Sequence, residues 1–145
     1  MRLRILSDLH IECFQEGRDL PDVAADVVIL AGDIHRTTEG LVWAAERFAG
    51  QKIIYVPGNH EFYGTSMPDV RRALRADAKR LRIHLLDNDT VNIDGVRFHG
   101  STLWTDLVCI PANLTMIRCR LNNVRSRLCL ISALSSNRWA RCSPL

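Results

Sequence analysis

Three short apolar runs dominate the first part of the chain. They cover about Arg2–Ser7, Asp26–Ala31 and Lys52–Val56. Each run is short and mainly apolar and contains β-branched residues, which is typical of parallel strands buried on both faces. Polar residues follow each run at once. The pattern therefore predicts parallel strands whose carboxyl ends meet at one edge of a sheet.

Two stretches of helical periodicity separate and follow these strands. In Glu39–Ala49 the apolar side chains recur on one helical face, and Gly50 ends the run. In Ser66–Leu81 the same periodicity follows a residue that favours helix starts. Ser66 is expected to cap this helix, and Asp69 three residues later would complete a capping box.

The pattern changes near residue 83. Ile83–Leu86 reads as a short strand, and Thr90–Ile93 and Val96–Phe98 flank Asp94-Gly95, a strong signal for a hairpin with a type I′ turn. The sequence thus predicts an α/β fold in which a parallel sheet with helices is followed by a β-hairpin that begins a second sheet.

Length and composition favour one globular domain. The chain has 145 residues, of which 47% are hydrophobic, and no apolar run approaches the roughly 18 residues that span a membrane. The N-terminus enters a strand without a preceding secretion signal, which predicts a cytoplasmic protein without a membrane partner. The odd number of cysteines, five, predicts free thiols in such a chain.

The net charge of +3 averages two unlike regions. Residues 1–106 hold all 16 acidic residues and 13 of the 19 basic ones, whereas residues 107–145 hold six Arg, no acid, no Gly and four of the five Cys. At ordinary composition, an acid-free stretch of this length is expected at roughly the 1% level. We therefore divide the chain into residues 1–106 and an atypical basic, Cys-rich tail, residues 107–145.

Three polar motifs follow the three predicted strands directly. They are Ser7-Asp8-Leu9-His10, Gly32-Asp33-Ile34-His35 and Gly58-Asn59-His60-Glu61. Because ligands of open α/β sheets bind at the carboxyl ends of the strands, we expect these carboxylates, imidazoles and amide to meet at one edge. That donor set suits divalent transition metals.

Each donor has an expected part in a two-metal centre. Asp8 and His10 are two residues apart at a strand end and therefore lie on one side. Asp33 can bridge two ions through its two oxygens, Asn59 offers a neutral oxygen, and His60 is placed to face the substrate. Two ions about 3.5–4 Å apart turn a shared water into a hydroxide that attacks phosphorus, while a histidine protonates the leaving oxygen.

The three motifs, in this order and each after a strand, resemble those of the calcineurin-like metallophosphoesterase family. The resemblance covers roughly residues 1–106 and includes Gly100–Asp106, which is similar to a stretch of bacterial members. It implies an α/β sandwich of two sheets flanked by helices. It also implies metal-dependent hydrolysis of phosphate mono- or diesters, with phosphorylated small molecules or nucleotides as substrates. We expect no nucleic acid partner, because the Arg residues of the tail are scattered rather than gathered on one basic face.

The resemblance also implies a role for each motif residue. Asp8 and His10 would bind the first metal, Asp33 would bridge, Asn59 would bind the second metal, and His60 would be the catalytic histidine. The two divalent ions would be Mn, Fe, Zn or Ni. We expect the neighbouring Glu and His residues of the motifs to orient their loops or to be solvated rather than to bind metal.

The second half departs from the family pattern. The family places further histidines there, ending in Gly-His-x-His, whereas this chain has no histidine beyond His99. The resemblance therefore implies a truncated sandwich, with incompletely liganded metals and one face of the first sheet uncovered. The alternative function is a catalytically incomplete fragment or pseudoenzyme that binds metal or phosphate weakly at most.

The tail suggests a reason for this departure. The abrupt loss of acids and Gly motivates the hypothesis that residues from about 107 onward are translated out of frame. Resequencing the gene tests it, because an uninterrupted downstream frame without Gly-His-x-His would contradict it. Within the tail, Ile117–Leu130 has a weak helical pattern. Its scattered Arg residues lack the interleaved aromatics of a nucleic-acid-binding surface.

Overall fold

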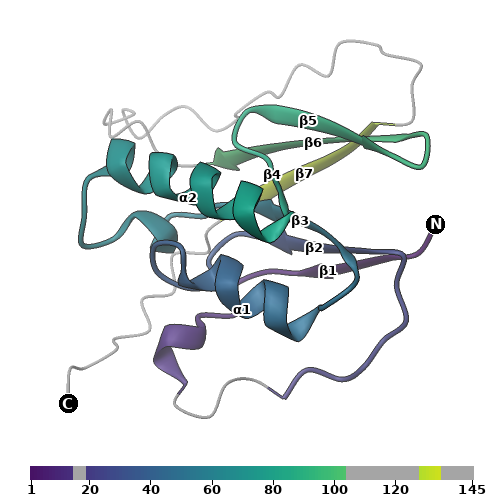
Figure 1. Ribbon diagram of the computed structural model, residues 1–145, viewed down its shortest axis with the longest axis horizontal. Coiled ribbons are helices and arrows are strands. Elements are labelled where there is room, and N and C mark those ends of the chain that lie inside the picture. The colour runs from purple at the N-terminus through teal and green to yellow at the C-terminus, as the bar shows by residue number, and fades with distance from the viewer. Residues whose placement is uncertain (15–18, 104–127, 135–145) are drawn as a thin grey trace, which may run out of the picture.

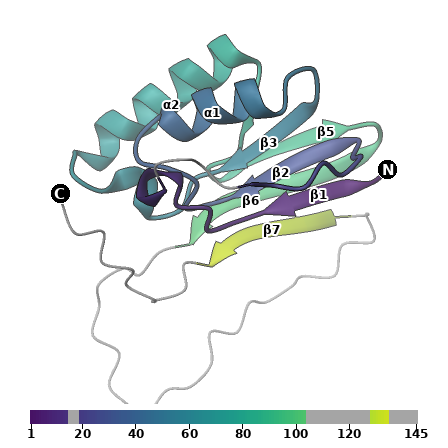
Figure 2. The same cartoon turned by 90° about the horizontal axis from the view of Figure 1, so that it is seen from below.

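The computed structural model describes residues 1–14 and 19–103 together with the backbone of residues 128–134. Figures 1 and 2 show three layers: two helices, a first sheet beneath them, and a second sheet on the opposite face of the first. The helices are α1 (Glu39–Arg47) and α2 (Met67–Leu81), and single 3₁₀ turns occur at η1 (Ile11–Cys13) and η2 (His60–Phe62).

The first sheet is parallel and four-stranded, as its apolar runs predict. Its strands lie in sequence order and are β1 (Leu3–Leu6), β2 (Val27–Ala31), β3 (Lys52–Val56) and β4 (His84–Leu85). All five residues of β2 are buried, because helices cover one face of this central strand and the second sheet covers the other. The predicted parallel sheet with helices is confirmed.

The second sheet contains the predicted hairpin and one further strand. It consists of β5 (Asp89–Ile93), β6 (Val96–Leu103) and β7 (Leu128–Leu134). β5 and β6 pair antiparallel, and both turn residues, Asp94 and Gly95, have positive φ, as a type I′ turn requires. β7 pairs parallel to β6.

Three local expectations are wrong. Leu128–Leu130 belongs to β7 rather than to a helix, and the rest of that predicted helix lies outside the described residues. Ser66 occupies the N-cap position of α2, but its side chain makes no capping hydrogen bond, so burial of the apolar face of α2 rather than a cap stabilises this end. Cys13 is disulfide-bonded rather than a free thiol.

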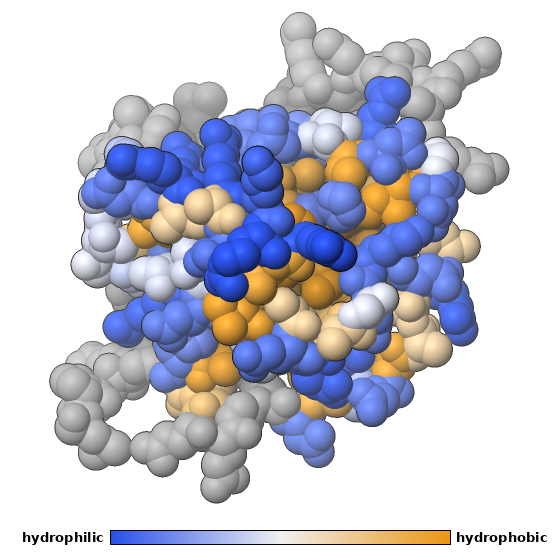
Figure 3. All heavy atoms as spheres, viewed as in Figure 1, coloured by the Kyte–Doolittle hydropathy of each residue, from blue (hydrophilic) through white to orange (hydrophobic). Residues whose placement is uncertain are grey.

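Two apolar clusters separate the layers. The larger lies between the helices and the first sheet and includes Leu30, Leu41, Tyr55 and Leu74. Figure 3 shows the face of the molecule that carries the helices. On this face an apolar patch is surrounded by hydrophilic side chains, because some apolar residues packed against this cluster are only partly buried. The smaller cluster lies between the two sheets and centres on Phe98, which is fully buried.

The expectation that one face of the first sheet is uncovered therefore fails over most of that face. The side chains of β2 and β3 on the face toward the second sheet are buried in the smaller cluster. The expectation holds only at β1, where Leu3 is 37% and Ile5 58% exposed. Both lie on that same face, because they pair in register with Val27 and Ile29 of β2, two members of the cluster.

The three layers place the polar motifs at a single edge. Each motif follows a strand of the parallel sheet, so all three leave the sheet on the side of its carboxyl ends. Among the described residues, no helix is long and apolar enough to cross a membrane.

Candidate functional site

The first two motifs run side by side beyond the ends of β1 and β2. The parallel hydrogen bonding continues past both strands, with Asp8 N–H donating to Gly32 C=O at 3.0 Å and His10 N–H donating to Asp33 C=O at 3.0 Å. These bonds fix the two loops relative to each other. As a consequence, Asp8, His10 and Asp33 each present a possible metal-ligand atom, and these three atoms lie within 4.8 Å of one another.

The backbone is strained where these donors lie. Asp8, His10 and Asp33 all have positive φ, at 53°, 46° and 55°. Residues other than glycine adopt this left-handed conformation at an energetic cost, and such residues cluster at functional sites. The tight turns allow each donor to leave its strand and still face the edge of the sheet.

The third motif is joined to the second through Asp33. The backbone N–H of His60 donates to Asp33 Oδ1 at 3.0 Å. Gly58 makes this approach possible, because a Cβ at that position would come within 2.5 Å of the Asp33 backbone nitrogen. Asn59, which lies between Gly58 and His60 in the chain, is buried, and its Nδ2 donates a hydrogen bond to the hydroxyl of Tyr63.

Glu61 stabilises the loops from inside. Its side chain is fully buried. Its carboxylate accepts hydrogen bonds from the backbone N–H groups of Asp33, Ile34 and Gly58 and from the hydroxyl of Tyr55, at 3.3, 3.0, 2.8 and 2.8 Å. Burial raises the pKa of the Glu61 carboxyl, and the hydrogen bonds from Ile34 and Tyr55 oppose that rise. Glu61 therefore orients the loops, as the sequence predicts.

His60 lies at the surface of this edge and contacts another imidazole. Its Nδ1 lies 3.2 Å from Nδ1 of His10, and the two rings meet edge to face with centroids 4.2 Å apart. The ring of Tyr63 lies on another side, at a centroid distance of 4.8 Å. The side chains of His10 and His60 are 23% and 24% exposed, so both remain accessible.

Sequence reasoning missed one titratable group in this site. Glu12 lies in η1, two residues after His10, and its Oε1 is 2.8 Å from Nδ1 of His60. With His10 and His60 it forms a second group of donors close enough to hold a metal ion. The residue follows the first motif without any apolar or turn signal of its own, so only the tertiary structure places it in the site.

His35 does not join the motif residues through its resolved contacts. Its Nε2 lies 3.2 Å from Oε2 of Glu39, and its Nδ1 accepts a hydrogen bond from the backbone N–H of Arg36. That His35 is not a metal ligand stays a prediction.

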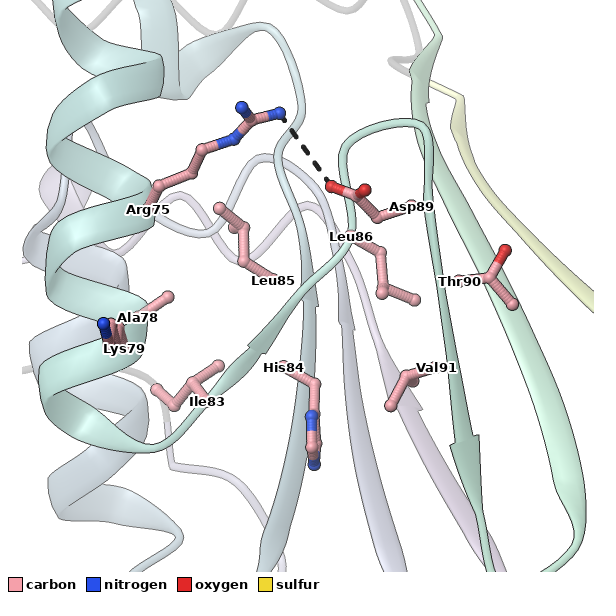
Figure 4. Close-up of a pocket in the computed structure, with 10 residues that line it drawn as sticks. All are labelled: Arg75, Ala78, Lys79, Ile83, His84, Leu85, Leu86, Asp89, Thr90 and Val91. Carbon is pink, nitrogen blue, oxygen red and sulfur yellow. Dashed lines mark ion pairs between the residues drawn. The ribbon is translucent and has the colours of Figure 1, made fainter.

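A separate hollow of about 410 Å³ lies between α2 and β5. Figure 4 shows the ion pair between Arg75 and Asp89, 3.9 Å long, that crosses it. None of the motif residues lines this hollow. It therefore does not belong to the edge described above.

Sequence comparisons give a matching family model and a relative. A family model described as the calcineurin-like phosphoesterase superfamily domain matches residues 1–109. An uncharacterized protein, L509 of Acanthamoeba polyphaga mimivirus, is 30% identical over an alignment of 128 residues, and the match covers 72% of this chain and 45% of that protein.

A solved structure shares the fold. Phosphopantetheinyl hydrolase from Mycobacterium tuberculosis matches with a TM-score of 0.58 and 22% identity, over 79% of this chain and 47% of that one. The chain thus spans about half the length of each of these relatives. The family model, which matches residues 1–109, shows that the chain belongs to the calcineurin-like phosphoesterase superfamily.

Proposed function

We propose that the chain hydrolyses phosphate mono- or diesters with the aid of divalent metal ions. The observation that carries this proposal is the convergence of Asp8, His10 and Asp33, whose donor atoms lie within 4.8 Å of one another at the carboxyl edge of the parallel sheet. Neither the strands nor their packing requires two carboxylates and an imidazole at this point.

The residues present fit such metal ions. Hard carboxylates combined with an imidazole suit Mn, Fe, Zn or Ni, and Glu61 holds the loop of Asp33 rigidly through buried hydrogen bonds. Asp8 and His10 would hold the first ion, Asp33 would be shared, and Asn59 would serve the second. When bound, such ions lower the pKa of water and neutralise phosphoryl charge.

The protein's own groups supply positioning and proton transfer. Asp33 is fixed through its bond from the His60 backbone N–H, so the carboxylate and the imidazole keep a constant relation. The half-buried His60 ring lies at the mouth of the site, within reach of a substrate. There it can donate a proton to the leaving oxygen of a phosphorylated small molecule or a nucleotide. A cytoplasmic location remains a prediction.

One observation favours the alternative, a fragment or pseudoenzyme with weak metal or phosphate binding. The sequence has no histidine beyond His99, so the described donors come from the three motifs and Glu12 alone. A second ion held by Asp33 and Asn59 would have fewer protein ligands than metal sites ordinarily use.

The experiment is an assay of the purified chain with Mn²⁺ on p-nitrophenyl phosphate and bis(p-nitrophenyl) phosphate. Asp33→Asn should lower turnover by more than about 100-fold, beyond the 10–100-fold that loss of an outer-shell partner causes. Asp22→Asn is the matched control, because the Asp22 side chain is 91% exposed and lies in another loop. Turnover that survives Asp33→Asn would contradict the proposal. Absence of both turnover and stoichiometric Mn²⁺ would establish the alternative.

A further inference from the structure

The outer edge of β4 faces the hollow between α2 and β5. In the four-stranded sheet β4 is the last strand, and it pairs with β3 on one side and with no described strand on the other. Figure 4 shows β4, which carries His84 and Leu85, running between α2 and β5. The hollow therefore lies where a fifth strand of the first sheet would run.

One residue of β4 directs its backbone polar groups toward this free edge. β4 and β3 run parallel with Leu85 opposite Tyr55, and the N–H of Leu86 donates to the C=O of Tyr55 at 2.8 Å. Successive residues of a strand turn their backbone groups to opposite sides, so the N–H and C=O of Leu85 point away from β3. Such groups at a free edge are a template for pairing with another extended chain.

Apolar side chains form the floor of the hollow. Three of them, Ala78, Ile83 and Leu86, are 3%, 6% and 2% exposed, and Leu85 and Val91 are partly buried. The volume of about 410 Å³ is within the range of ordinary ligand pockets. Because the side chains of a strand alternate between its two faces, a strand beside β4 would turn them alternately toward α2 and toward β5. Both layers offer apolar surface to such a strand.

Positive charge gathers on the α2 side of the hollow. Arg75 and Lys79 are four residues apart on α2, hence neighbours on one helix face, and both line the hollow. Within the described residues the side chain of Lys79 has no ion-pair partner. Arg75 lies 3.9 Å from Asp89, and both side chains are more than half exposed. So exposed and widely spaced a pair contributes little to stability, which means that an incoming carboxylate can replace Asp89.

The charge of the hollow decides which extended chain fits it. Arg75 and Lys79 repel a basic segment and attract an acidic one. The tail of this chain, residues 107–145, has six Arg and no acid, so its charge has the wrong sign. A segment that alternates acidic and apolar residues matches the cations on the side of α2 and Val91 on the side of β5. In such strand addition the main chain supplies affinity and the alternate side chains supply specificity.

We propose that the hollow binds an extended acidic segment of a partner protein, which adds to β4 as a fifth strand. The N–H and C=O of Leu85 pair with the backbone of this segment. Its acidic side chains face Arg75 and Lys79, and one of them takes the place of Asp89 beside Arg75. The site shares no residue with the three motifs, so it goes beyond the proposed hydrolysis and does not depend on it.

The test uses two acetylated and amidated peptides, Glu-Val-Glu-Leu-Glu and Lys-Val-Lys-Leu-Lys, added to the ¹⁵N-labelled full chain at about 0.15 M salt. At saturation the acidic peptide should slow hydrogen exchange of the Leu85 amide about 10-fold or more, because a hydrogen-bonded amide exchanges only when its pairing opens. The basic peptide carries the same apolar residues and should leave the exchange of that amide unchanged.

Charge reversal on α2 gives a second readout. Arg75→Glu combined with Lys79→Glu should weaken binding of the acidic peptide by about 10-fold or more, since each reversal exchanges an attraction for a repulsion of similar size. The matched control is Arg72→Glu combined with Arg80→Glu. This pair changes the net charge equally, at exposed residues of α2 that do not line the hollow, and should weaken binding by less than about 2-fold.

Several results would overturn the proposal. Binding without protection of the Leu85 amide, equal binding of the two peptides, or equal losses in the two double variants would show that no acidic strand adds to β4. Absence of binding to the wild type at millimolar peptide would do the same, whether or not the variants fold. Protection of Leu85 that rises with protein concentration without peptide would make a second copy the occupant. None of these measurements requires turnover, so they leave the proposed function untouched.

Discussion

The buried carboxylate of Glu61 gives the sharpest test of how the loops are held. Replacing it in Glu61→Gln keeps the shape of the side chain but turns one acceptor oxygen into an N–H₂ donor. One pair of donors faces each oxygen: Tyr55 O–H and Ile34 N–H at Oε1, Gly58 N–H and Asp33 N–H at Oε2. No orientation of the amide satisfies all four donors.

The cost follows from the better of the two orientations. With the amide nitrogen at the Oε1 position, the Tyr55 hydroxyl can rotate and accept, and only the N–H of Ile34 loses its acceptor. A buried donor without a partner costs about 1–3 kcal/mol, and the remaining bonds weaken as they lose their charge. Removing a buried charge recovers some desolvation energy. We expect a net loss of about 1–3 kcal/mol in the free energy of unfolding.

Urea denaturation followed by circular dichroism measures this loss. The control is Glu46→Gln, a matched change at an exposed position of α1, which should alter the free energy of unfolding by less than about 0.5 kcal/mol. If Glu61→Gln were as stable as this control, the hydrogen bonds of Glu61 would not hold the loops.

Four further outcomes are expected. Because burial raises the folded-state pKa of Glu61 above 4.5, the folded state binds the carboxyl proton more tightly than the unfolded state does. The stabilisation linked to this proton is full below pH 4.5 and is lost as pH rises through the raised pKa, so the pH dependence of unfolding should flatten in Glu61→Gln. Tyr55→Phe should cost about 1–3 kcal/mol in urea denaturation, since it removes one hydrogen bond to that charge. Phe98→Ala should cost about 3–5 kcal/mol by the same measurement, because it empties the centre of the cluster between the sheets. Ile5→Ser should change the free energy of unfolding by less than about 0.5 kcal/mol, because Ile5 is 58% exposed. The same change should reduce self-association in sedimentation experiments. A loss of stability as large as that of Phe98→Ala would show that β1 is covered.

The sequence was sufficient for the elements that local patterns control. Short β-branched runs such as Lys52–Val56 form strands at the predicted residues, because only a strand buries both faces of so short a run. Asp94-Gly95 forms the predicted turn, since both residues tolerate positive φ. Local patterns were less reliable where pairing with a distant strand determines the secondary structure. Leu128–Leu130, for example, pairs with β6 despite a weak helical periodicity.

The candidate site divides in the same way. The strand-end positions of Asp8, Asp33 and Asn59 follow from the sequence, because parallel strands bring their carboxyl ends together whatever the loops contain. The part played by Glu12 does not follow from the sequence. It depends on how a 3₁₀ turn after the first motif directs a side chain toward an imidazole 48 residues away in the chain.

The sequence by itself therefore determined the parallel strands and the helices of this protein, the edge at which its polar motifs lie, and the family to which it belongs. Hydrophobic periodicity and strand-end motifs are local patterns, so they can be recognised without knowledge of any long-range contact. Only the tertiary structure decided which groups act together there: the bond from His60 to Asp33, the inward turn of Glu61, and the pairing of Glu12 with His60. These depend on distances of a few ångströms between loops far apart in sequence, which packing of the whole domain fixes.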